Sequence, residues 1–256
     1  MLETATVPAQ ESQVDTLPPY PLDQKEIEVA IVAGKQKLFH KLLKPTLAQL
    51  IERENQTSYQ SESISDDEEQ IVSDDEGANA RLYDQIVTGA KGYLMPGQPR
   101  QASEEWRSKD DAWVKLIPSA HKSLAVRSMY RFTCEIERDA IEEEGFLLGE
   151  TLWTVKQTFG DPDAPAYVVR HHLRTPDEKA RREFKGKASR VSFSKGTRKQ
   201  HTRIATNLKA YVELYDGLYS GIDGVSGSTS LPNIDAIWKR QVVDCLMREF
   251  DAQLSD

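Results

Sequence analysis

The first patterned segment of the chain alternates apolar and other residues from Ile27 to Ile31, which is typical of a β-strand. Gly34 marks a turn, and residues 38–42 can return as a second strand. Pro45-Thr46 then leads into a short helix with apolar residues on one side, starting at Leu47. The pattern therefore predicts a β-hairpin followed by a helix.

The next segment, residues 60–76, contains eight acidic residues and no basic one, so we expect it to repel itself and stay mobile. Apolar residues then recur at helical spacing from Ala78 to Ala90. Gly89 and Gly92 are predicted to end that helix. A long helix is predicted from about Ser119 to Glu144, because its apolar residues lie three or four positions apart.

The second part of the chain returns to β structure over residues 145–176, with a charged helix after Pro176. Residues 190–204 alternate like a hairpin that turns at Gly196. Asn207 can cap the helix that comes next. A last helix is predicted from Asn233, with Trp238, Val242, Leu246 and Phe250 on its apolar stripe.

An internal repeat is indicated by five identities at one offset. The triplet Leu82-Tyr83-Asp84 matches Leu214-Tyr215-Asp216, Gly89 matches Gly221, and Gly92 matches Gly224. The order of the predicted elements also matches, which is a stronger signature than isolated identities. We interpret the triplet as structural, with Leu and Tyr facing a core and glycines that allow a helix to stop. Chance similarity between amphipathic helices is the alternative.

The predicted fold class is therefore α+β, with two similar units that each combine a small β-hairpin or sheet with several helices. Residues 1–22 are rich in proline and are expected to form a disordered or extended N-terminal arm. Residues 23–144 form the first predicted unit, which carries the acidic insertion. Residues 145–256 form the second, which carries a basic hairpin.

Charge separates the two predicted units. Residues 170–209 carry thirteen Lys and Arg against three acidic residues, although the whole chain has a net charge of −8. At the offset of the repeat, the acidic run falls opposite Arg198 to His201. Opposite charges on similar units would guide head-to-tail docking and determine its register. The alternative is that both segments are unrelated solvated loops.

The candidate interaction residues are the members of these two charged sets. They are Asp66, Asp67, Glu68 and Glu69 in the acidic run, and Arg181, Arg182, Lys195, Arg198, Lys199 and Arg203 in the basic segment. The acidic run lacks the spacing and the terminal Glu of a calcium loop. His171 and His172 are adjacent on a predicted strand, so they point to opposite faces and do not easily share one metal ion.

No catalytic residue set is apparent, and we expect a non-enzymatic protein without a cofactor or a bound metal. The sequence has no phosphate-binding glycine loop, nucleophile elbow or HExxH motif. Cys134 and Cys245, both in apolar patterns predicted as helical, are expected to be free buried thiols. The N-terminus does not resemble a secretory signal, and no apolar run is long enough for a membrane helix, so we expect synthesis in the cytoplasm and no membrane partner.

Two segments carry a resemblance to a known class of proteins. The order EVAIVAGKQKLFHKLLKPTLAQLIERE is similar to the opening of bacteriophage tail-assembly and virion-associated proteins. The segment RHHLRTPDEKARREF resembles its proline-led transition into a helix a second time. The resemblance implies a structural or assembly protein of a phage-like tail or virion particle, which binds other particle proteins and itself as an oligomer. The alternative is a nucleic-acid-associated protein that uses the basic 170–209 face. An enzyme of a type that the sequence does not reveal is the third hypothesis.

Overall fold

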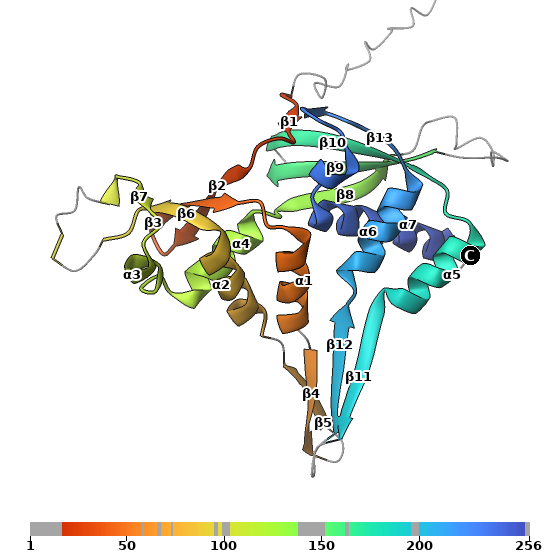
Figure 1. The fold of residues 1–256 in the computed structure, drawn as a ribbon, viewed down its shortest axis with the longest axis horizontal. Coiled ribbons are helices and arrows are strands. Elements are labelled where there is room, and N and C mark those ends of the chain that lie inside the picture. Colours follow the sequence, from red (N-terminus) through yellow and green to blue (C-terminus); the bar gives the residue numbers. More distant parts are fainter. Residues whose placement is uncertain are drawn as a thin grey trace, which may run out of the picture.

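A computed structural model describes residues 17–57, 59–65, 68–72, 74–94, 97–98, 103–137, 152–161, 164–195 and 200–253 (Figure 1). The fold is α+β, as predicted, with seven α-helices and sheets of antiparallel strands among these residues. The elements are, in chain order, β1 (Tyr20–Pro21), β2 (Glu26–Ala33), β3 (Gln36–Leu43), α1 (Leu47–Gln56), β4 (Tyr59–Ser65), β5 (Glu68–Val72), α2 (Asp75–Ile86), β6 (Val87–Lys91), β7 (Arg107–Ser108), α3 (Asp111–Val114), α4 (Ser119–Ser128), β8 (Phe132–Glu137), β9 (Leu152–Asp161), β10 (Ala164–Arg174), α5 (Glu178–Lys187), β11 (Ser189–Lys195), β12 (Gln200–Thr206), α6 (Leu208–Leu218), β13 (Tyr219–Asp223), β14 (Val225–Ser226), η4 (Leu231–Asn233) and α7 (Ala236–Gln253).

Three four-stranded sheets organise these elements. The first has the order β2-β3-β6-β7, and the second has the order β13-β10-β9-β8. The third, which we call the hairpin sheet, has the order β11-β12-β4-β5 and projects away from the other two (Figure 1). We call the chain from β2 to α4 the first half and the chain from β9 to α7 the second half.

The predicted β-hairpins and the helices after each proline are confirmed. Thr46 caps α1 through a capping box with Gln49, and the Asp177 side chain accepts a hydrogen bond from the backbone N–H of Ala180 at the start of α5. Asn207 lies at the start of α6 as predicted, but its side chain does not cap that helix. The side chain instead donates to the carbonyl oxygen of Lys187, which ties the start of α6 to the end of α5.

The predicted long helix from Ser119 to Glu144 is wrong. Helix α4 ends at Ser128, and Phe132–Glu137 form strand β8, on which Cys134 lies. Residues 138–144 lie outside the described residues. The last helix was predicted too early, since Asn233 belongs to the short η4 turn and α7 begins at Ala236.

The glycines of the repeat do not end helices, which corrects their predicted role. Gly89 lies inside β6 and Gly221 inside β13, each in the strand that follows the LYD helix directly. Gly92 and Gly224 come just after these strands and have positive φ values of 99° and 75°. A left-handed backbone is where glycine is needed, so the matching glycines mark the ends of strands.

The acidic run is also not a simple mobile segment. Residues 59–65 and 68–72 form β4 and β5, which pair antiparallel as a hairpin with a register shift between Ser63 and Ser65. Like-charge repulsion would keep this segment mobile in isolation. Strand β12, from far along the chain, pairs with β4 and contributes backbone hydrogen bonds.

The described end of the N-terminal arm, which was predicted to be disordered or extended over residues 1–22, is extended and packs against the second half. Tyr20 and Pro21 form β1, which pairs with β14, and the side chains of Tyr20 and Leu22 are buried in the core of the second half. The Tyr20 ring lies edge-on to Trp238, with ring centroids 4.7 Å apart. Residues 1–16 lie outside the described part of the chain.

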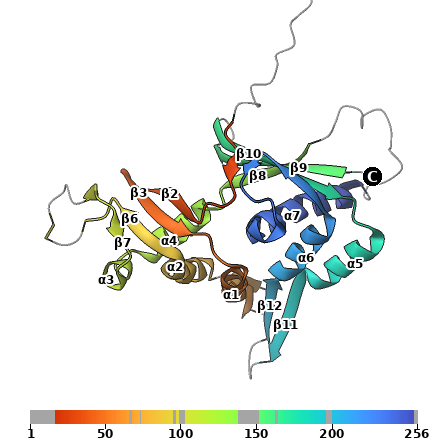
Figure 2. The same ribbon diagram turned by 45° about the horizontal axis from the view of Figure 1, so that its top comes forward.

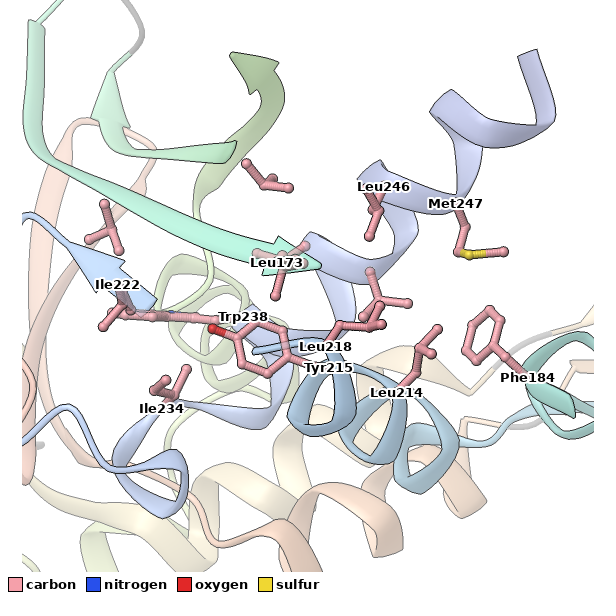
Figure 3. Close-up of a cluster of buried hydrophobic side chains, with 14 of the residues drawn as sticks. Leu173, Phe184, Leu214, Tyr215, Leu218, Ile222, Ile234, Trp238, Leu246 and Met247 are labelled. Atoms are coloured by element: carbon pink, nitrogen blue, oxygen red, sulfur yellow. The ribbon is translucent and has the colours of Figure 1, made fainter. Parts of the chain in front are cut away.

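Each half has its own hydrophobic core. In the second half, Tyr215, Leu218 and Trp238 lie together between the sheet and helices α6 and α7 (Figure 3). The first half has a second cluster around Tyr83, to which Leu208 and Ile237 from the second half also belong. The cores therefore meet across the two halves. None of the described helices is long and apolar enough to cross a membrane.

Candidate interaction site

The two oppositely charged hairpins lie side by side in one sheet. Strand β12 of the basic hairpin pairs antiparallel with β4 of the acidic hairpin, with Ile204 opposite Tyr59, Arg203 opposite Gln60 and Thr202 opposite Ser61. Figure 1 shows the four strands projecting from the body beside α1 and α6, and Figure 2 shows β11 and β12 projecting in the same way. The segments that the sequence singled out by charge are thus joined at the level of the backbone.

The predicted interaction residues fall on different parts of this arrangement. Glu68 and Glu69 begin β5, Lys195 ends β11, and Arg203 lies in β12. Asp66, Asp67, Arg198 and Lys199 lie outside the described residues. The hairpin sheet therefore brings Glu68, Glu69, Lys195 and Arg203 into one element.

Arg181 and Arg182 lie on α5, away from the strands of the hairpin sheet. Arg182 is exposed and forms an ion pair with Glu178, one turn earlier on the same helix. Arg181 is half-buried, and its guanidinium lies 5.6 Å from the centre of the Phe250 ring on α7. The geometry gives Arg181 an internal packing contact, so it is a weaker candidate for an interaction surface than Arg182.

A buried ion pair joins the two halves beside the hairpin sheet, and sequence reasoning missed it. Glu54 of α1 is only 7% exposed. Its carboxylate lies 2.8 Å from Arg53 and 3.0 Å from Arg240 of α7. A buried carboxylate requires paired charges, so Glu54 holds the helices of the two halves together at the base of the hairpins.

Each half also contains a buried histidine–tyrosine pair at its centre. The Tyr83 hydroxyl lies 2.8 Å from Nδ1 of His40, and the Tyr215 hydroxyl lies 2.7 Å from Nδ1 of His171. All four side chains are fully buried. Burial lowers the pKa of His40 to about 4 and that of His171 to about 3, so both imidazoles are neutral at pH 7.

The sequence contained a signal for these pairs. In both halves the histidine stands five residues before the proline that precedes the helix, at His40 before Pro45 and at His171 before Pro176. The tyrosine is the middle residue of the LYD triplet. Their separations of 43 and 44 residues are too long for a local motif, which is why the pairing was not apparent.

The third residue of each triplet keeps its side chain partly exposed and also forms an ion pair that matches between the halves. Asp84 lies 2.8 Å from the Lys122 ammonium of α4, and Asp216 lies 2.6 Å from the Lys239 ammonium of α7. Both lysine side chains are less than 10% exposed. Each pair links the LYD helix of its half to the half's last helix.

Strand pairing repeats in the same detail. The β3–β6 pairing places His40 opposite Ala90 and shifts register between Lys41 and Leu42. The β10–β13 pairing places His171 opposite Ile222 and shifts register between His172 and Leu173. Lys41 and His172 each follow the buried histidine directly, so the two shifts occur at matching positions.

His172 lies on the opposite face of β10 from His171, as predicted for adjacent strand residues. Its Nε2 lies 2.7 Å from the carboxylate of Asp223, and its Nδ1 lies 3.1 Å from the Thr154 hydroxyl. Within the described ranges, no group of three or more His, Cys, Asp or Glu side chains could hold a metal ion. Cys134 and Cys245 are free and half-buried, and burial raises the pKa of the Cys134 thiol to about 12.

A groove between α5 and α6 differs between the halves. It has a volume of about 680 Å³, and its lining residues include Phe184, Leu214, Arg174 and Lys187. The corresponding space between α1 and α2 is too narrow to admit a water molecule.

Two substitutions between the halves account for the difference in volume. Counting from the helix caps and the LYD triplets, Ala180 stands where α1 has Gln49, and Gly217 stands where α2 has Gln85. Both glutamines line the narrow space of the first half. Small residues therefore open the groove in the second half alone.

Comparisons with known proteins add no identification. No family model matches the chain, and no significant match to it was found among curated proteins or among solved structures.

Proposed function

We propose that this chain is a non-enzymatic structural or assembly protein of a phage-like particle, which acts through protein–protein contacts and associates with further copies of itself. The observation that supports this most directly is the hairpin sheet. The chain's two halves already meet there as neighbouring subunits of an assembly would, through backbone pairing of β12 with β4. Such a contact can be repeated between molecules.

The proposal includes an internal duplication of one α+β unit. The buried His–Tyr pairs, the Asp–Lys ion pairs and the register shifts occupy matching positions in both halves. The order of three paired strands also matches, since β6-β3-β2 corresponds to β13-β10-β9. Two unrelated halves would rarely share such specific polar contacts by chance, because each contact requires two matched residues far apart in the sequence.

The phage-like setting rests on the resemblance of residues 28–54 and 170–184 to virion-associated and tail-assembly proteins. The arrangement of the halves is compatible with it, because particle components commonly associate through repeated contacts between similar units. Its partners would be other particle proteins as well as this chain itself.

A nucleic-acid role is the second candidate, and one observation favours it. The basic hairpin projects from the body of the protein, so the phosphates of a nucleic acid could reach it (Figure 1). The acidic hairpin lies directly beside it, however, and a neighbouring acidic strand disfavours phosphate binding. The same charges suit docking between copies of the chain.

A charge-reversal experiment separates the two functions. Lys195, Arg198 and Lys199 are changed to Glu in one variant, and Asp66, Asp67, Glu68 and Glu69 are changed to Lys in another. Association of each protein, and of their mixture, is measured by sedimentation velocity at low and at physiological salt. Binding to a DNA duplex is measured in parallel by fluorescence anisotropy.

The structural role predicts that wild-type protein associates and that association weakens as salt rises, because the Debye length shortens to about 8 Å at physiological salt. The first variant should lose association, and the mixture of the two variants should recover part of it. A nucleic-acid role predicts that the first reversal removes DNA binding and that the acidic variant does not restore it. A wild-type chain that stays monomeric in every condition would contradict the self-assembly part of the proposal.

A further inference from the structure

The junction between the two hairpins has a direction. Strand β4 is the first strand of the acidic hairpin, and β12 is the second strand of the basic hairpin. In the order β11-β12-β4-β5, the first strands therefore take positions one and three, and the second strands take positions two and four. The step from one hairpin to the other is a shift by two strands in the same direction.

A shift of this kind does not pair two copies symmetrically. A two-fold axis would instead place two first strands, or two second strands, at the centre of the sheet. Here, among the described strands, one edge is a first strand, β11, and the other edge is a second strand, β5. These are the same two kinds of strand that meet at the internal junction, and an edge strand presents unpaired N–H and C=O groups to a partner.

We propose that β5 of one copy pairs antiparallel with β11 of a second copy, in the register that β12 and β4 use within the chain. This inference rests on the proposed function and names the contact through which the copies associate. The interface is head-to-tail, so it generates a closed ring or an open filament rather than a symmetric dimer. Both partners are this chain.

The register is determined by the two hairpins. Val72 lies opposite Gln60 in the acidic hairpin, and Ile204 lies opposite Val191 in the basic hairpin. At the offset that matches Leu82 with Leu214, Val72 corresponds to Ile204, so their cross-strand partners Gln60 and Val191 correspond as well.

The internal junction places Arg203 opposite Gln60. The residue that corresponds to Arg203 is Ile71, which immediately precedes Val72 just as Arg203 precedes Ile204. The contact between copies accordingly places Ile71 opposite Val191, with Val72 opposite Arg190 and Gln70 opposite Ser192.

Charge supports this choice of partner. The edge strand β5 begins with two glutamates and is followed by the acidic residues that start α2. The edge strand β11 contains Arg190 and Lys195 and follows the basic helix α5. An acidic edge thus meets a basic edge, whereas pairing of β5 with β5 or of β11 with β11 would bring like charges together.

The helices beside the junction obey the same rule. Within the chain, α1 packs against α6 and β12, and its buried Glu54 pairs with Arg240 of α7. Counting from the helix caps, the residue of α5 that corresponds to Glu54 is the exposed Lys185. In the contact between copies, α5 lies against the first half of the neighbour, where Asp75 and Glu76 begin α2. The basic helix α5 thus lies beside the acidic start of the neighbour's α2.

The test is disulfide cross-linking in the full-length chain. One variant carries Ile71→Cys together with Val191→Cys, and the matched control carries Ile71→Cys together with Lys195→Cys, which moves one cysteine by about 13 Å along the strand. Two strands separate β5 from β11 within a chain, or about 14 Å, so neither pair can close inside one molecule. Cys134 and Cys245 stay in both variants, so any linkage through them is the same in each.

After mild oxidation, the in-register variant should give a ladder of covalent oligomers at least about tenfold stronger than the control, because disulfides require a Cα separation below about 7 Å. Single variants with Ile71→Cys alone should not link to themselves, but should link to Val191→Cys chains when the two are mixed. Self-linkage of Ile71→Cys chains would show a symmetric β5–β5 contact and overturn the inference.

Sedimentation velocity on the same reduced samples distinguishes failure of the contact from failure of the proposed function. Variants that associate but link no better than the control refute the β5–β11 contact and leave the proposed function standing. Variants and wild-type protein that all remain monomeric refute the contact and the proposed self-assembly together. A ladder confined to the in-register pair supports both.

Discussion

Replacing the buried His171 by Gln should remove a defined part of the protein's sensitivity to acid. His171 is fully buried, its Nδ1 accepts a hydrogen bond from the Tyr215 hydroxyl at 2.7 Å, and its Nε2 donates to Oε1 of Gln157 at 3.2 Å. Burial, with a smaller contribution from the neighbouring His172, lowers its pKa to about 3. Glutamine keeps a polar side chain at the position but does not titrate.

The size of the effect is set by proton linkage. In the unfolded chain His171 has an ordinary pKa of about 6.5, so below that pH the unfolded state binds a proton that the folded state refuses. The folded pKa is the lower one, so this stability is fully present above pH 6.5 and is lost as the pH falls toward 3. Between pH 7 and pH 5, the loss from this residue is about 2 kcal/mol of unfolding free energy.

The assay is urea unfolding of wild-type and His171→Gln protein at both pH values. Other groups titrate in the same range, among them His40, which burial also keeps neutral, and Asp235, whose pKa burial raises to about 6 and which acts in the opposite direction. These groups are common to both proteins, so they cancel when the two losses are subtracted. The variant should lose about 2 kcal/mol less than wild-type protein between pH 7 and pH 5. Equal losses would show that His171 is accessible to protons in the folded state and would refute its placement in the core.

Two further changes test the described core by the same unfolding assay. Tyr215→Phe should cost about 1–3 kcal/mol because it leaves Nδ1 of His171 without its donor, and Tyr215→Ala should cost about 3–5 kcal/mol because it also leaves a cavity; a loss within error for the alanine variant would mean that the ring is exposed. Gly224→Ala should destabilise by more than about 1 kcal/mol, since the residue has a φ of 75° and an added Cβ would overlap the carbonyl oxygen of Val168. Gly217→Ala is its matched control, because the site is helical and open, and it should stabilise by up to about 1 kcal/mol; equal effects of the two alanines would contradict the described backbone.

Local patterns predicted those elements whose partners lie close in sequence. The alternation from Ile27 to Ile31 became β2, and the proline-led steps became α1 and α5, because a hairpin and a helix cap are determined within about ten residues. The same periodicity misled at residues 132–136. Phe132 and Ile136 are four positions apart, as on one face of a helix. Together with Cys134 they also follow the two-residue spacing of a strand, and pairing with β9 decides between the two structures.

Contacts between distant residues could not be predicted in the same way. The acidic run forms strands because β12, more than a hundred residues later, provides hydrogen bonds that like-charge repulsion does not outweigh. Glu54 and Arg240, 186 positions apart, form part of the contact between the halves, and no local pattern marks either residue. The two charged sets could be found in the sequence, but the backbone pairing that joins their strands required the structure.

The positions at which the halves agree and differ support a division of labour within the proposed duplication. The agreements are contacts within a half, namely the His–Tyr pairs and the Asp–Lys pairs, and these contacts hold a half together. The differences lie in the charges of the hairpins and in the groove that Ala180 and Gly217 open. Two hairpins of the same charge would bring like charges together at the junction within the chain and again between copies. Hairpins of opposite charge avoid both repulsions, so in the proposed contact each chain presents one edge of each sign and pairs with its neighbours in one direction only.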